Sequence, residues 1–125
     1  MPRIKHIAIL TPDAEALAGF YKETFQLEEV QRLESDTGRW RIFLSDGHIN
    51  LAILPARADG PEGINHFGFE VEDVKAISEA AVNAGAQQGP EQVARDGRGN
   101  EAFIKDPFGN RVDLSVHGWP TAPVE

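Results

Sequence analysis

Two histidines hold equivalent positions in an internal repeat of the sequence. The segment 5–9 (KHIAI) returns at 65–69 (NHFGF), and each copy is followed by an acidic segment that opens a helix. Apolar side chains alternate with others in both copies, which is typical of a half-buried strand. His6 and His66 therefore lie on the face opposite the apolar side chains. Since neutral imidazole is a common metal ligand, a fold that repeats this unit about a pseudo-twofold axis can bring two such ligands to one point.

Two further polar residues follow the same alternation on the last strand of each half. Asn50 precedes an apolar run that includes Leu51 and Ile53, and Asp113 lies between Val112 and Leu114. If the apolar members of these strands face the helices, Asn50 and Asp113 face the same way as the histidines. The four polar residues then point into one concave face of a curved sheet.

Two imidazoles and a carboxylate on rigid strands suit a divalent Fe, Mn, Ni, Co or Zn ion with open coordination positions. We therefore predict that His6, His66 and Asp113 are metal ligands. We place Asn50 beside the reacting centre as a catalytic residue, and three roles stay open for it: a weak oxygen ligand, a hydrogen-bond donor to a metal-bound substrate, or a structural residue. Small residues next to these four predict an open cavity: Ala8, Ala52, Gly68 and Ser115.

The elements that position these residues form two tandem βαβββ modules in an α+β fold. Module 1 covers about residues 3–55, a linker rich in proline and glycine covers 56–63, and module 2 covers about 64–117. We expect a single domain over residues 1–118, in which eight strands form a curved, partly open barrel with the helices outside. The tail at 119–125 contains two prolines and is predicted to fray.

Each module has a recognisable helix after its first strand. A capping sequence at 11–13 opens the first helix, which is expected to run to about Phe25. Three-and-four spacing predicts which of its side chains are buried: Leu17, Phe20, Tyr21 and Thr24. The second helix begins near Asp73 and is stopped by Gly85.

Composition narrows the class of protein. The chain has 125 residues, no cysteine, and 20 acidic against 12 basic residues. Any metal must therefore be held by nitrogen and oxygen ligands, and the acidic balance argues against nucleic acid and favours a neutral or cationic ligand. Neither a signal peptide nor a membrane-spanning stretch is visible, so we expect a cytoplasmic protein.

These motifs resemble the vicinal oxygen chelate superfamily, which includes glyoxalase I, methylmalonyl-CoA epimerase, extradiol dioxygenases, glutathione-type fosfomycin resistance proteins and bleomycin resistance proteins. The resemblance rests on the paired histidine strands, the Phe20-Tyr21 helix motif and the ending DPFGNRVD at 106–113. It implies that His6, His66 and Asp113 are the metal ligands. Asn50 falls where glyoxalase I and the epimerase supply a fourth ligand, usually glutamate or glutamine. The resemblance also implies a homodimer, because two chains of this superfamily often build the site together.

Two functional hypotheses follow. The first is a metalloenzyme of the glyoxalase or dioxygenase type that chelates a small vicinal-oxygen substrate and stabilises an oxyanion or activates dioxygen. The alternative is a metal-free protein that sequesters a small, cationic ligand, as bleomycin resistance proteins do. Among the remaining residues, His48 and His117 are expected at the surface. Arg41 and Arg111 each have two interpretations, a contact to a substrate carboxylate or support of a neighbouring acid, and the second is favoured.

Overall fold

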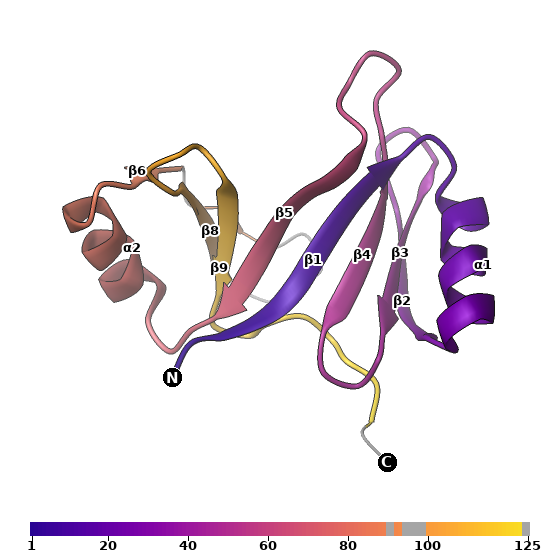
Figure 1. The fold of residues 1–125 in the computed structure, drawn as a ribbon, viewed down its shortest axis with the longest axis horizontal. Coiled ribbons are helices and arrows are strands. Elements are labelled where there is room, and N and C mark those ends of the chain that lie inside the picture. The colour runs from indigo at the N-terminus through magenta and orange to yellow at the C-terminus, as the bar shows by residue number, and fades with distance from the viewer. Residues whose placement is uncertain (90–91, 94–99, 124–125) are drawn as a thin grey trace. The chain divides into compact units, whose positions relative to one another are not determined.

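The structure is a computed structural model that describes residues 1–89, 92–93 and 100–123 of the chain. It divides into two compact units. We call them the α1 unit, made of His6–Asn65 and Trp119–Glu125, and the α2 unit, made of Met1–Lys5 and His66–Gly118. The α+β class is confirmed, since each unit combines one helix with a mixed sheet (Figure 1). In the described part of the chain, neither helix is long and apolar enough to cross a bilayer.

The α1 unit contains the first βαβββ module. Its strands lie in the order β2-β3-β4-β1, with β1 parallel to β4 and the other neighbours antiparallel. The first three residues of β1 belong to the α2 unit. The elements are β1 (Arg3–Thr11), α1 (Ala14–Phe25), β2 (Glu28–Glu34), β3 (Trp40–Ser45) and β4 (Asn50–Pro55).

Helix α1 begins where the capping sequence predicted. The carboxylate of Asp13 accepts a hydrogen bond from the backbone N–H of Ala16 at 3.0 Å, which satisfies one of the free donors of the first turn. Buried Ala14 and Ala18 pack, together with partly buried Leu17 and Tyr21, on one face of the sheet. The prediction was wrong for Phe20 and Thr24, which are exposed. Both lie beside the buried stripe at positions 14, 17, 18 and 21, where small alanines face the sheet.

The α2 unit repeats the module with shorter middle strands. Its order is β5-β9-β8-β6, with β7 also paired to β8, and β5 runs parallel to β9. From the sequence, residues 86–100 of this module are expected to hold a short strand and a polar loop. A short strand is present at β6, and residues 90–91 and 94–99 lie outside the described residues. The first three residues of β5 belong to the α1 unit. The elements are β5 (Gly63–Glu70), α2 (Val74–Asn83), β6 (Gln87–Gln88), β7 (Gln92–Val93), β8 (Asn100–Lys105) and β9 (Arg111–Ser115).

Helix α2 repeats the capping and packing of α1. The Asp73 carboxylate accepts from the N–H of Ala76 at 3.0 Å. Gly85 follows the helix with a φ of 104°, a left-handed conformation that favours glycine. The helix packs its apolar side on the strands through Val74, Ile77 and Ala81, against Val71, Ile104, Val112 and Leu114.

Residues 119–123 of the predicted tail are held in place instead of frayed, and residues 124–125 lie outside the described residues. Residues 119–123, which we call the C-terminal strap, lie on the α1 unit, and Trp119 and Ala122 are buried. The N–H of Ala122 donates to Ser45 Oγ at 2.9 Å, and the side-chain amide of Asn50 donates to the carbonyl of Pro120 at 2.7 Å. Apolar burial and these two hydrogen bonds hold a segment that has no regular secondary structure.

Candidate metal centre

In the α1 unit, the two predicted site residues are neighbours. Strands β1 and β4 pair in parallel with His6 level with Asn50. Ala8 and Ala52, which lie two residues further along each strand, belong to a buried cluster separate from the one that contacts α1. Because side chains alternate, His6 and Asn50 lie on this second face, as predicted. Phe43 packs on the two alanines, however, so the space that these small residues were expected to leave open is filled.

The C-terminal strap contacts both residues. The indole of Trp119 stacks on the His6 imidazole, with ring centroids 4.4 Å apart and ring planes within 9° of parallel. Asn50 is fully buried, and its amide nitrogen is used by the Pro120 carbonyl. Its Oδ1 is buried and accepts no hydrogen bond from the described residues. The pairing of the nitrogen fixes the orientation of the amide and leaves its oxygen unused. This oxygen is the atom that can ligate a metal or accept a hydrogen bond.

In the α2 unit, His66 and Asp113 are in direct contact. Both side chains are buried, and His66 Nε2 lies 3.2 Å from Asp113 Oδ2. The other carboxylate oxygen accepts from Arg111 Nε at 2.9 Å, and the Arg111 guanidinium lies 4.6 Å from the centre of the Phe103 ring. Arg111 therefore supports a neighbouring acid, which is the interpretation favoured from the sequence.

Electrostatics keep the carboxyl of Asp113 in its charged form. Burial alone raises its pKa, because a low-dielectric environment disfavours the charge. The hydrogen bonds and charges of His66 and Arg111 outweigh burial and hold the pKa below its usual value. A buried anionic oxygen beside an imidazole nitrogen is the form of Asp113 that a metal requires.

The spacing of this pair fits two ligands of one ion. Donor atoms bound at about 2.1 Å lie about 3.0 Å apart at right angles and about 3.4 Å apart at the tetrahedral angle. The observed separation of 3.2 Å lies between these values. Imidazole nitrogen and carboxylate oxygen also form a donor set that suits the first-row divalent metals.

The other candidate residues lie elsewhere. His48 is exposed in the turn before β4, where its backbone N–H donates to Asp46 Oδ1. His117 is exposed too and lines a cavity of about 390 Å³ beside α2. Ala102, which also lines that cavity, pairs with Leu114 and shares its face, so the cavity lies on the side of these strands opposite Asp113. The acid partner favoured for Arg41 is absent among the described residues, where this arginine has no hydrogen bond or ion pair.

Sequence reasoning did not identify the strap as part of this region. The sequence allows Trp119 to be a core or an interface aromatic, and no periodic pattern connects it to His6. The composition of the segment, one tryptophan among prolines, was the available signal, and it indicated only a tail.

Two βαβββ modules with a buried histidine on the first strand of each define a protein of the glyoxalase type. The family model described as Glyoxalase/Bleomycin resistance protein/Dioxygenase superfamily matches residues 3–114, and the chain belongs to this superfamily.

Among known proteins, several epimerases are similar to the chain. An ethylmalonyl-CoA/methylmalonyl-CoA epimerase of Cereibacter sphaeroides is 31% identical over 97 residues, which cover 68% of this chain and 72% of the epimerase. A solved variant of Streptomyces coelicolor methylmalonyl-CoA epimerase, in complex with 2-nitronate-propionyl-CoA, is 25% identical with a TM-score of 0.71 and coverage of 90% and 92%. A hypothetical protein from Bacillus halodurans C-125 shows the same fold at 17% identity, with a TM-score of 0.77 and coverage of 99% and 98%.

Proposed function

We propose that the chain is a metal-dependent isomerase that acts on an acyl-CoA thioester with a second oxygen function, of the methylmalonyl-CoA kind. The superfamily contains several reaction types, and the comparisons favour isomerisation among them. The relative from Cereibacter sphaeroides and the enzyme from Streptomyces coelicolor are both epimerases of such thioesters.

We propose His6, His66 and Asp113 as the ligands of one divalent ion. The observation that carries this proposal is the buried contact between His66 and Asp113, whose spacing suits two ligands of one metal. His6 is the counterpart of His66 in the sequence repeat and is buried as well. Asn50 lies level with His6 on the adjacent strand, and its unused Oδ1 is the fourth donor.

A bound divalent metal would supply Lewis-acid stabilisation of negative charge on the substrate oxygens. The residues of the chain supply the setting. Asp113 provides the negative charge of the ligand set, and Arg111 fixes its orientation through Oδ1. The indole of Trp119 covers one face of the His6 ring and restricts its rotation. Held in this way, the donors need little reorganisation when charge develops on the substrate.

Hydrogen exchange at C2 of methylmalonyl-CoA tests the proposal. Protein freed of metal and reloaded with Fe, Mn, Ni, Co or Zn under anaerobic conditions is incubated with methylmalonyl-CoA in D₂O, and deuterium at C2 is measured by mass spectrometry. We expect metal-dependent incorporation above the rate without protein, lost in His66→Ala and kept in His117→Ala.

Two results would contradict the proposal in different ways. Stoichiometric metal without C2 exchange would exclude this isomerase activity while leaving the metal site. Failure to bind any of the five ions would exclude the site itself and favour the metal-free binding protein.

A further inference from the structure

Buried polar atoms without partners gather on one face of the α1 unit. Among the described residues, three such atoms are Gln31 Oε1, Arg41 Nε and Asn50 Oδ1. On β3, Phe43 pairs with Ala52 and Ser45 pairs with Asn50, so Arg41 shares their face by alternation. On β2, Gln31 pairs with Phe43, which places it on the same face.

This distribution points to a ligand. Native proteins pair nearly all of their buried polar groups, so each exception calls for a physical reason. Asn50 Oδ1 is the donor proposed above for the metal, whereas Arg41 Nε is an N–H donor that needs an acceptor. Leaving such a group unpaired costs stability, and a ligand that binds it recovers part of that cost. The three atoms share the face that carries His6, and the opposite face packs against α1.

Arg41 differs from the other arginines described in this sheet. Arg32 binds the carboxylates of Glu15 and Glu29, and Arg39 donates to two backbone carbonyls. Arg41 has no hydrogen bond or ion pair among the described residues, although its Nε is buried. A half-buried guanidinium without a counter-ion is a site for an external anion.

We propose that Arg41, assisted by Gln31, forms a subsite for an anionic group of the substrate, either a carboxylate or a phosphate. This inference rests on the proposed function, since acyl-CoA thioesters carry both groups. The planar guanidinium offers paired N–H donors to either anion, and the Gln31 amide can donate through its nitrogen when rotated. Gln31 lies diagonally across from Arg41, because it pairs with Phe43 while Leu33 pairs with Arg41.

The subsite lies at the opposite end of this face from His6 and Asn50. Arg41 is four residues along β3 from Ser45, which is level with Asn50, and four residues of strand span roughly 13 Å. The long side chain of arginine shortens this separation. At this separation a phosphate of CoA, which is many bonds from the thioester, fits better than the methylmalonyl carboxylate, which is attached to the carbon next to the thioester carbonyl.

Net charge makes a localised cation necessary. The chain carries a formal charge of −8, so its overall field repels an anionic substrate. The Arg41 guanidinium, which has no counter-ion among the described residues, reverses the sign locally on the site face. The anion proposed here differs from the neutral or cationic ligand that the overall acidity favoured.

Titration of small anions tests the subsite without relying on catalysis. Metal-free protein is titrated with malonate and with inorganic phosphate, and binding is followed by nuclear magnetic resonance of backbone amides. Arg41→Met is compared with Arg57→Met, which removes the same charge from an exposed position in the linker. We expect at least one anion to bind about tenfold more weakly to Arg41→Met, and Arg57→Met to match the unsubstituted protein. Arg41→Lys, which keeps the charge without the planar fork, should lie between them and guards against a folding defect.

Three thioesters identify which anion is bound. Loss of affinity in Arg41→Met for methylmalonyl-CoA and methylmalonyl-pantetheine, but not for propionyl-CoA, assigns the carboxylate. Loss for both CoA esters, but not for the pantetheine ester, assigns a phosphate. Unchanged binding of every probe to Arg41→Met, or no binding of any probe to the unsubstituted protein, would overturn the subsite. Arg41-dependent binding of malonate or phosphate without C2 exchange of methylmalonyl-CoA would retain the subsite and contradict the proposed reaction instead.

Discussion

Asp113 is the residue on which the proposed site most depends. Its two oxygens are divided between His66 and Arg111, so a single carboxylate joins the candidate ligand to a positive charge. A metal ion bound by both His66 and Asp113 would replace the direct contact between these two side chains. It would leave the hydrogen bond from Arg111 to Asp113 intact. The carboxylate would then keep one fixed oxygen while the other binds the metal.

Replacing Asp113 by asparagine tests this role. We expect Asp113→Asn to lower the affinity for Mn or Ni by about 100-fold or more, because even the loss of an outer-shell partner costs 10–100-fold. Calorimetric titration of metal-free protein gives the affinity.

Asp106→Asn is the matched control for that experiment. Asp106 lies in the turn before β9, and its side chain accepts from the N–H groups of Phe108 and Asn110 at 2.9 Å. This change should lower the free energy of unfolding and leave metal affinity unchanged. Equal losses of metal affinity in the two variants would show that Asp113 acts only through stability.

At the scale of elements, the C-terminal strap connects the end of the chain to the candidate ligand His6. The chain has two tryptophans, so Trp40→Phe leaves Trp119 as its sole indole. Because Trp119 stacks directly on His6, a paramagnetic ion bound by that imidazole should quench its fluorescence. We predict that Ni or Co quenches the Trp119 fluorescence of Trp40→Phe in a saturable way. The midpoint of this quenching should equal the metal affinity measured by calorimetry.

The reciprocal variant provides the control. In Trp119→Phe the remaining indole is Trp40, which is partly exposed near Arg32 and away from the strap. Its emission should not change with metal. Quenching of equal size in both variants would contradict the assignment of His6 as a ligand.

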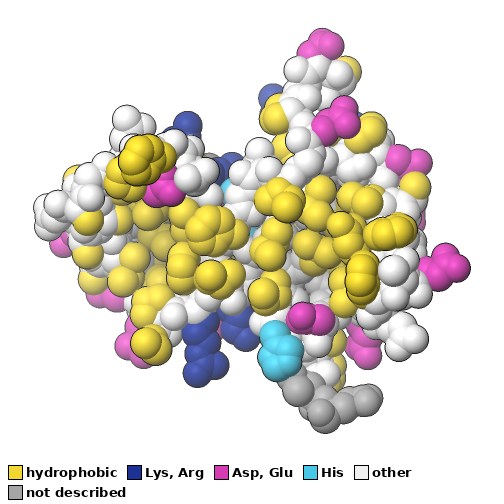
Figure 2. Space-filling model, viewed as in Figure 1, with side chains coloured by type: hydrophobic (Ala, Val, Ile, Leu, Met, Phe, Trp, Pro, Cys, Tyr) yellow, Lys and Arg dark blue, Asp and Glu magenta, His cyan; other side chains and the backbone are white. Residues whose placement is uncertain are grey.

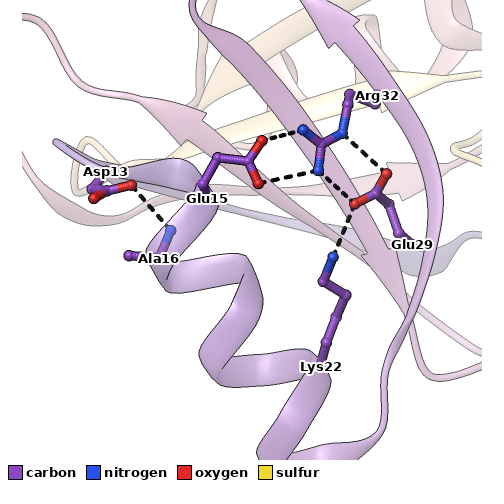
Figure 3. A network of polar contacts seen from close by, with 6 residues as sticks. All are labelled: Asp13, Glu15, Ala16, Lys22, Glu29 and Arg32. Carbon is purple, nitrogen blue, oxygen red and sulfur yellow. Dashed lines mark hydrogen bonds and ion pairs between the residues drawn. The ribbon is translucent and has the colours of Figure 1, made fainter.

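An ion-pair network joins helix α1 to strand β2 (Figure 3). Arg32 binds Glu15 from the helix and Glu29 from the strand, and Lys22 binds Glu29 at 3.1 Å. The hydrogen bond from Arg32 is the main cause that lowers the pKa of Glu29 from 4.5 to about 2; burial opposes it and Lys22 adds to it. Since the pKa is depressed in the folded state, the stabilisation is complete above pH 4.5 and is lost as the pH falls toward 2.

The corresponding prediction concerns acid stability. Glu29→Gln should remove about 1 kcal/mol or less at neutral pH, because the pair is partly exposed to water and salt, and should flatten the decline in unfolding free energy between pH 4.5 and 2. Urea unfolding across this range measures both effects. Glu23→Gln, an exposed acid of the same helix, should keep the decline. An unchanged pH profile in Glu29→Gln would show that the network does not contribute.

Local patterns in the sequence predicted most of the helices and strands, and the strand faces on which site residues lie. Strand alternation is a property of neighbouring residues, so the faces of His6 and Asn50 followed from sequence, as did the caps at Asp13 and Asp73. The two hydrogen bonds of the strap join residues that are separated by 70 and by 77 positions in the sequence. The strap itself has no periodicity, so no local pattern predicts these contacts. Arg41 is a similar case, because its lack of a partner in the described part of the chain becomes visible only when its neighbours are placed.

At the scale of the whole molecule, exposed apolar side chains accompany the expectation of a homodimer. Hydrophobic side chains occupy much of the face seen in Figure 2. On α1, Phe20 and Phe25 are 52% and 61% exposed. Phe25 stacks on Tyr21, and Phe20 contacts both rings edge-to-face. Patches of this kind often mark contacts between chains. Light scattering should therefore give twice the chain mass of 13.7 kDa, whereas a mass of one chain would contradict the dimer.

The central claim is that histidines from both modules bind the same ion. X-ray absorption at the metal edge of protein loaded with one equivalent of Ni or Co measures this most directly, because scattering from imidazole rings reports their number. We expect two imidazoles with oxygen donors in the unsubstituted protein, and one in His6→Ala. A spectrum with one imidazole in the unsubstituted protein, or one that His6→Ala leaves unchanged, would contradict it.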